Sequence, residues 1–297
     1  MTRLTVLCAI SLMLFVSMSE STPIPKELKG CVAFIFVGPS KDSLSPNGTA
    51  FFVRAASSGD SSAPIFLVTA KHVLQDATKR YFRRVWVRLN KRGVGADTLL
   101  VELFTKAKPL FQVHPDSTVD IAVVPSPIPI ALYDHSAIAE SLITTDEIFR
   151  REDMREGDDV FFTGLFTHHY GTTRNIPIVR FGKVALISQE RVLWDSVLTD
   201  LYLIETTSFG GNSGSPLFFY FDVTRDPGFW GFEGPRLFLA GIVKGYFGEP
   251  TQFRIIETKG RIPWPIQNSG IAAVVSAHYP YDILHPKTSL RQDRRPK

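Results

Sequence analysis

Gly211-Asn212-Ser213-Gly214-Ser215-Pro216 places a serine beside glycines in a short segment closed by proline. A nucleophilic serine needs open space around its hydroxyl and backbone N–H groups directed at the oxyanion that forms. Glycine suits both needs, since it has no Cβ and adopts φ/ψ values that bring successive amides to one point. Taken alone, the hexapeptide also fits an ordinary surface turn between two strands.

Two other segments favour the catalytic interpretation. Residues 66–74 form an apolar strand that runs into a short turn with His72, and residues 117–124 place Asp120 at the start of an apolar strand. A carboxylate beside apolar residues needs a hydrogen-bond partner, and an imidazole N–H provides one. A half-buried or capping histidine and a strand-end aspartate are the alternatives for the single residues. The order His72, Asp120, Ser213 is that of one known catalytic triad.

With these three motifs the chain resembles the trypsin-like (chymotrypsin-fold) serine peptidases, from about Gly30 to about Leu284. The segment 239–243, Leu-Ala-Gly-Ile-Val, is similar to the strand that follows the nucleophile in that family. Asn212 and Ser215 make the motif more similar to the disulfide-poor bacterial branch, with its glutamyl endopeptidases and periplasmic heat-shock proteases. An appended peptide-binding module, which the latter often carry, is not expected here.

The resemblance implies a role for each motif residue. Ser213 attacks the scissile carbonyl, His72 transfers the proton, and Asp120 orients the imidazole. The backbone N–H groups of Gly211 and Ser213 form the oxyanion hole. Asn212 lacks the charge that pairs with a new N-terminus in animal relatives, so we expect no activation switch of that kind.

Substrate contacts are expected on both sides of the nucleophile. The resemblance implies a specificity pocket with Thr207 at its base, Ser208 beside it, and Lys244, Gly245 and Tyr246 along the opposite wall. No aspartate lies at the base, which excludes the device that selects Arg or Lys. A small or apolar side chain is the expected substrate residue, and Lys244 could favour an acid if it turns inward or could be solvated. The long insertion 222–236 either reaches over the groove or forms a plain hairpin loop.

No cofactor or metal is expected. His168 and His169 would point to opposite faces of a strand, and the spacing of His114, His135, His278 and His285 is not that of metal ligands.

The N-terminus predicts export. Arg3 precedes an apolar run over residues 4–16 and then small residues, so residues 1–21 are typical of a signal peptide. We therefore expect a secreted or periplasmic protein with no stable membrane span after the signal is removed. Cys8 lies in that signal, so the mature chain would keep Cys31 alone, a buried apolar residue, and would form no internal disulfide.

The charge pattern excludes a nucleic-acid binder. The net charge is +4, and the segment from residue 286 onward contributes all of it through Lys287, Arg291, Arg294, Arg295 and Lys297 against Asp293. The rest of the chain is near neutral, and its one basic stretch with aromatics, residues 79–84, flanks an expected strand and fits a solvated strand edge. We expect residues 286–297 to be a disordered basic tail.

Short apolar segments between Gly, Pro, Asn and Asp predict an all-β fold. We expect two packed six-stranded antiparallel β-barrels, the N-terminal one over residues 22–125 and the C-terminal one over residues 159–285, with a short C-terminal helix. Residues 126–158 would connect them and contain a short helix over 145–152.

This arrangement places the three candidate residues in the crevice between the barrels, where an extended polypeptide could pair with a strand edge. The sequence therefore predicts a secreted serine endopeptidase. A catalytically silent protease-fold peptide-binding protein is the main alternative, and a structural β-barrel protein is a weaker one. The sequence predicts neither the oligomeric state nor the physiological substrate.

Overall fold

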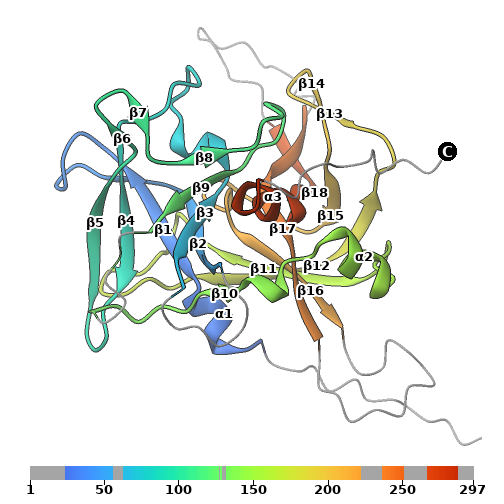
Figure 1. The fold of residues 1–297 in the computed structure, drawn as a ribbon, viewed down its shortest axis with the longest axis horizontal. Helices are drawn as coiled ribbons and strands as arrows, with labels where there is room; N and C mark the ends of the chain where they lie inside the picture. The colour runs from blue at the N-terminus through green and yellow to red at the C-terminus, as the bar shows by residue number, and fades with distance from the viewer. Residues whose placement is uncertain are drawn as a thin grey trace, which may run out of the picture.

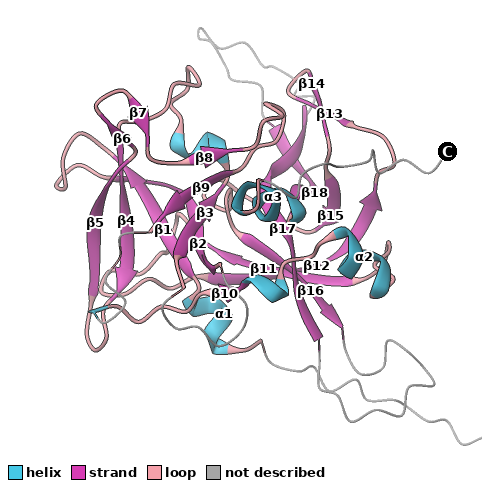
Figure 2. Ribbon diagram, viewed as in Figure 1, coloured by secondary structure: helices cyan, strands magenta, loops and turns pink. Residues whose placement is uncertain are grey.

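The computed structural model describes residues 24–55, 63–126, 128, 132–221, 236–250 and 266–286, and β-strands are the main regular structure in them (Figure 2). The helices in this part of the chain are short: α1 (Lys26–Gly30), α2 (Asp146–Arg151) and α3 (His278–Leu284). The predicted signal peptide, residues 222–235 of the insertion and the tail from residue 287 lie outside the described residues. None of the helices in the described ranges is long and apolar enough to cross a membrane.

The first half of the chain forms an eight-stranded sheet with the order β5-β4-β1-β2-β3-β9-β8, in which β10 pairs with β2. Its strands are β1 (Val32–Val37), β2 (Ser45–Arg54), β3 (Ile65–Thr69), β4 (Arg84–Asn90), β5 (Ala96–Glu102), β8 (Gln112–Val113), β9 (Ala122–Pro125) and β10 (Ile138–Ala139). The central strands are rich in β-branched and aromatic residues, which suit a buried pleated surface.

The first sheet is not the closed barrel that we expected, because β5 and β8 are not paired with each other in the described part of the chain. Between β5 and β9 the chain makes only two-residue strands, and β6 (Phe104–Thr105) pairs with β7 (Lys108–Pro109) in a separate hairpin. Proline and solvated lysines interrupt the pairing in this segment. The strand β8 pairs with β9 through Gln112 and Val113.

The second half forms a closed six-stranded barrel with the order β11-β12-β15-β18-β17-β16. Its strands are β11 (Asp159–Gly164), β12 (Ile178–Ile187), β15 (Tyr202–Glu205), β16 (Pro216–Phe221), β17 (Arg236–Pro250) and β18 (Ile266–Ser276). Closure leaves this sheet without free edges along most of its length. The prediction of a C-terminal barrel agrees with the structure.

Side chains of the barrel pack into two hydrophobic cores. Along β11, Val160 and Phe162 pack inside the barrel, whereas Phe161 between them packs into the larger core that continues into the first sheet. This alternation follows from the two-residue period of a strand. The helix α3 also joins the halves, since it lies against β9 between them (Figure 1).

Several elements differ from the predictions. The segment Asn47–Gly48, which favours a tight turn by its sequence, lies within β2, where Asn47 forms a bulge opposite β1. The hairpin of β13 (Val192–Trp194) and β14 (Val197–Thr199) was missed. Its turn residues Asp195 and Ser196 have positive φ values of 46° and 64°, but they lack the glycine that marks such turns in a sequence.

Two local predictions agree with the structure. The helix α2 begins after Thr145, whose Oγ1 accepts a hydrogen bond from the backbone N–H of Ile148 at 3.3 Å. Cys31 is buried at 1% exposure, and its Sγ donates to the carbonyl oxygen of Leu28 at 2.9 Å. Burial raises the pKa of this thiol well above its usual range.

Candidate active site

His72 lies in a 3-10 turn, Lys71–Leu74, that directly follows β3. Its Nδ1 lies 2.7 Å from Oδ2 of Asp120, and its backbone N–H donates to Oδ1 of the same carboxylate at 2.9 Å. The imidazole side chain is 44% exposed, whereas the carboxylate is 6% exposed. The carboxylate therefore fixes the imidazole from the buried side and leaves the rest of the ring accessible.

Asp120 lies just before β9, next to the strand that carries the His72 turn. Burial raises the pKa of Asp120, but His72 and Lys244 favour the charged form more strongly and hold this pKa well below its usual range. Asp120 is therefore an anion at any neutral pH, with a proton donor or cation against each oxygen.

Ser213 lies in the loop between β15 and β16, and two glycines give this loop its shape. Gly211 and Gly214 have φ values of +93° and +85°, which other residues rarely adopt. A Cβ on Gly214 would lie 2.0 Å from the carbonyl oxygen of Thr49, so glycine is required there. Asn212 is buried and secures the loop, because its Nδ2 donates to Leu165 O at 2.7 Å and its Oδ1 accepts from Phe209 N at 2.9 Å.

Thr49 on β2 joins this loop to the first sheet, a role that we did not predict. Its backbone N–H donates to Ser213 O at 2.8 Å, its Oγ1 donates to Gly211 O at 2.9 Å and accepts from Leu165 N at 2.9 Å. Thr69 Oγ1 in turn donates to Thr49 O at 2.7 Å. A buried threonine in an apolar strand was the only signal of this role in the sequence.

The hydroxyl of Ser213 donates to the carbonyl oxygen of Lys244 at 3.0 Å. Among the described residues, no hydrogen bond joins Ser213 to His72.

The predicted oxyanion-hole amides are unoccupied by protein groups. The backbone N–H groups of Gly211 and Ser213 donate to no atom of the residues that the structure covers. Gly210, which precedes them, faces open space. Two free N–H groups beside a serine hydroxyl can bind a developing oxyanion.

The predicted substrate-binding residues divide into two groups. Tyr246 is half-buried, and its ring lies 6.5 Å from that of Phe209, next to Gly210. Thr207 is exposed, and Ser208 is fully buried with its carbonyl bonded to Asn268 Nδ2. The aromatic pair, rather than these two hydroxyls, provides a contact surface beside the loop.

Lys244 points toward Asp120. Its Nζ donates to Asp120 Oδ2 at 3.0 Å, and its side chain is 11% exposed. It is therefore neither a solvated lysine nor a free cation on a pocket wall. A basic residue at this position in the sequence gave no indication of the direction of its side chain.

Trp194 of the β13-β14 hairpin is a second residue that the sequence did not indicate. Its ring covers Gly245, where a Cβ would lie 3.1 Å from Trp194 Cη2. It also lies 4.9 Å from the Phe247 ring and 5.7 Å from Lys244 Nζ. The absence of a side chain on Gly245 makes room for this indole.

No group of three or more His, Cys, Asp or Glu residues that could hold a metal ion occurs in the described ranges. The histidines outside the candidate site have other contacts: His278 Nδ1 lies 2.7 Å from Ser276 Oγ, His285 bonds Glu140, and His135 packs on Phe52.

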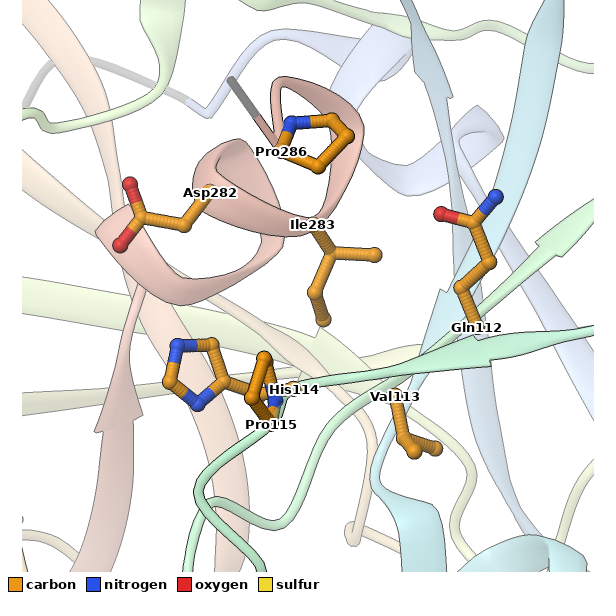
Figure 3. Close-up of a pocket in the computed structure, with 7 residues that line it drawn as sticks. All are labelled: Gln112, Val113, His114, Pro115, Asp282, Ile283 and Pro286. Atoms are coloured by element: carbon orange, nitrogen blue, oxygen red, sulfur yellow. The ribbon is translucent and has the colours of Figure 1, made fainter. Parts of the chain in front are cut away.

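A hollow of about 310 Å³ lies away from these residues, between β8 and α3. Figure 3 shows its lining residues, with Gln112, Val113, His114 and Pro115 on one side and Asp282, Ile283 and Pro286 on the other. It includes none of the residues predicted to act on a substrate.

No family model matches the sequence, and no curated protein matches it. A solved structure, the MamO protease domain from Magnetospirillum magneticum in its apo form, is similar at 14% sequence identity with a TM-score of 0.50. The similarity covers 86% of this chain and 96% of that domain. The chain therefore has the fold of a protease domain.

Proposed function

We propose that this chain is a secreted serine endopeptidase, in which Ser213 is the nucleophile, His72 the general base and acid, and Asp120 the residue that orients the imidazole. The observation that supports this most is the paired contact of Asp120 with the side chain and the backbone of His72. Asp120 would fix the imidazole tautomer and stabilise the imidazolium that forms when Ser213 attacks. The amides of Gly211 and Ser213 would bind the oxyanion.

An exposed strand edge supports a polypeptide as the substrate. The strand β16 pairs with β17 only as far as Ile242, opposite Pro216, whereas β17 continues to Pro250 paired with β18. The edge of β17 beyond Val243 therefore has no strand partner among the described residues, and it starts beside Ser213. An extended peptide could pair with this edge and present its carbonyl to the serine.

The predicted signal peptide supports secretion.

The contact of the Lys244 ammonium with Asp120 bears on substrate specificity. Because Lys244 is bonded to Asp120, it does not supply a free positive charge for an acidic substrate residue. The aromatic rings of Phe209, Tyr246 and Trp194 favour an apolar substrate side chain instead. The closer kinship with disulfide-poor bacterial peptidases stays a prediction.

A catalytically silent peptide-binding protein is the second candidate. The orientation of the Ser213 hydroxyl toward Lys244 O, without a bond to His72, favours it. Such a protein would use the same strand edge and aromatic rings without turnover.

Covalent labelling separates the two candidates. A peptidase should react with a fluorophosphonate at Ser213, and the Ser213→Ala and His72→Ala variants should not. Mass spectrometry of the labelled peptide identifies the site. A folded native protein that binds peptides but does not label would overturn the enzyme proposal in favour of the binder. N-terminal sequencing of the exported protein tests whether residues 1–21 are removed.

A further inference from the structure

Lys244 is a buried lysine whose ammonium contacts the same carboxylate as His72. Its Nζ lies 3.0 Å from Asp120 Oδ2, the oxygen that also lies 2.7 Å from His72 Nδ1. The Trp194 ring lies 5.7 Å from the ammonium, with its face available for a cation–π contact. One carboxylate oxygen is therefore shared by the amino group of Lys244 and by the imidazole.

The backbone of β17 fixes Lys244 independently of this side-chain contact. Lys244 lies at a bulge in the pairing of β17 with β18, next to Val243, which exchanges hydrogen bonds with the loop that carries the serine. The carbonyl oxygen of Lys244 accepts from Ser213 Oγ, while its Nζ reaches Asp120. A substitution at this side chain can thus change the charge beside Asp120 and keep the backbone contact with Ser213.

We propose that Lys244 is a positioning residue of the triad, and that its ammonium makes the coupled His72–Asp120 pair take up a proton only in more acidic solution than the pair would alone. This inference rests on the proposed peptidase function for its catalytic meaning. The triad would then keep a basic imidazole, and so remain active, further into the acid range. The cost is a smaller stabilisation of the imidazolium during attack, because a cation lies beside the carboxylate.

The distances make this effect large. An opposite or like charge within about 4–6 Å changes the proton affinity of a site by roughly one to three pH units. Because His72 and Asp120 share a hydrogen bond, they bind protons as a pair, and a cation against the shared oxygen disfavours every added proton. Together with His72, the larger contributor, Lys244 also holds the pKa of the buried Asp120 below its usual range.

Other charges around the pair act less directly. The Nζ of Lys71 donates to the carbonyl oxygens of Ser117 and Val119 and not to the carboxylate. Asp116 forms a salt bridge with Arg191. The charge of Asp116 raises the pKa of Lys71, and the charge of Lys79 lowers it. Burial and, after it, the charge of Asp120 raise the pKa of Tyr81. Lys71 is therefore a matched control, a second lysine near Asp120 without a contact to its carboxylate.

The test measures the rate of fluorophosphonate labelling at Ser213 from about pH 4 to about pH 9 in the full chain. We expect Lys244→Met to shift the acid limb of the rate profile upward by about one pH unit. At a pH below the acid limb of both proteins, the variant should therefore label about tenfold more slowly than the native protein. Lys244→Arg should keep the native limb because it keeps the cation. Lys71→Met should shift the limb by less than half as much.

Lys244→Gln provides a second neutral variant, which keeps a hydrogen-bond donor to Asp120 if Lys244→Met does not fold. It should shift the limb in the same direction as Lys244→Met. An unchanged limb in the neutral variants would overturn the proposal, as would a shift in Lys244→Arg or in Lys71→Met as large as that in Lys244→Met. A change in the relative cleavage of acidic and neutral peptides without a shift of the limb would instead assign Lys244 to substrate selection.

A second measurement does not depend on activity. The pH midpoint of the His72 ring resonance, assigned by its absence in His72→Gln, can be followed by NMR in a Ser213→Ala background. The midpoint should move upward by about one pH unit in Lys244→Met and stay in place in Lys244→Arg. If the native protein does not label at any pH, the proposed function fails, and this titration still decides the role of Lys244: an unmoved midpoint refutes it.

Discussion

Asp120 has a hydrogen-bond partner at each of its carboxylate oxygens, and these contacts explain why it stays charged in a buried position. His72 and Lys244 lower the pKa of Asp120 by more than burial raises it. A group whose pKa is lowered in the folded state stabilises the fold above its ordinary pKa, and this contribution is lost as the pH falls through the lowered value.

We expect Asp120→Asn to reduce labelling of Ser213 by about 10⁴-fold at neutral pH, because an amide favours the wrong imidazole tautomer. The variant should also be less stable than the native protein at neutral pH. This difference in the free energy of unfolding should shrink below about pH 4, where the native carboxylate begins to lose its contribution. Urea unfolding at several pH values measures it. A difference that grows as the pH falls would contradict the assignment.

Gly214 allows a second test at a single position. We expect Gly214→Ala to lower the free energy of unfolding by at least about 3 kcal/mol, because the added Cβ collides with the Thr49 carbonyl and φ is positive. Gly210→Ala is the matched control, since its Cβ would face open space. Denaturant unfolding compares the two. Equal losses would show that the loop does not have this conformation.

Single residues differ in how much of their role a sequence reveals. The sequence pointed to His72 in the turn after an apolar strand and to Asp120 at the start of another, and the structure brings them into contact. It also pointed to Lys244, but it left open whether the side chain was solvated or faced a substrate. A carboxylate 124 residues away decides the direction of the lysine, and no local pattern records that distance.

The strands also differ in how much of their extent the sequence predicts. Most strands were predictable, since their apolar segments end at Gly, Pro, Asn or Asp. The extension of β17 to Pro250 was not, because Gly245 and Gly248 weaken its strand pattern, and pairing with β18 supports it instead. The open first sheet was also missed, since the failure of β5 and β8 to meet depends on the three-dimensional course of the chain between them.

Substitutions in the β13-β14 hairpin test whether this element contacts the substrate. Trp194 packs over Gly245 of the strand whose edge we propose for substrate, so Trp194→Ala should lower kcat/KM for an apolar peptide by about tenfold. Leu193→Ala is the control on the same hairpin, because Leu193 is 61% exposed. Because Trp194 also packs against the core, Trp194→Ala should be the less stable variant, and the rates are compared under conditions in which both variants are folded. A peptide assay that finds equal rates for the two would remove Trp194 from the substrate surface.

The two halves of the molecule depend on each other through Thr49, which joins the first sheet to the serine loop. We expect Thr49→Val to destabilise the protein by about 2–4 kcal/mol, since Leu165 N–H and Gly211 O would lose a buried partner. It should also slow labelling of Ser213, because Gly211 O and its loop are no longer held.

Thr163 provides an isosteric control for this substitution. It is equally buried, and its Oγ1 has no hydrogen-bond partner among the described residues. Thr163→Val should therefore leave the free energy of unfolding within about 0.5 kcal/mol or raise it. Thermal and urea unfolding of both variants check the comparison, and a larger loss for Thr163→Val would refute it.

Because Cys31 is buried, the rate at which a reagent modifies its thiol reports on opening of the first sheet. A thiol reagent in solution can reach this sulfur only when the start of β1 separates from its neighbours, and the raised pKa keeps the sulfur protonated until then. The modification rate should thus follow the opening equilibrium of the first sheet, and it should rise in Thr49→Val far more than in Thr163→Val. Time-resolved mass spectrometry of the alkylated peptide would measure how often the first sheet opens.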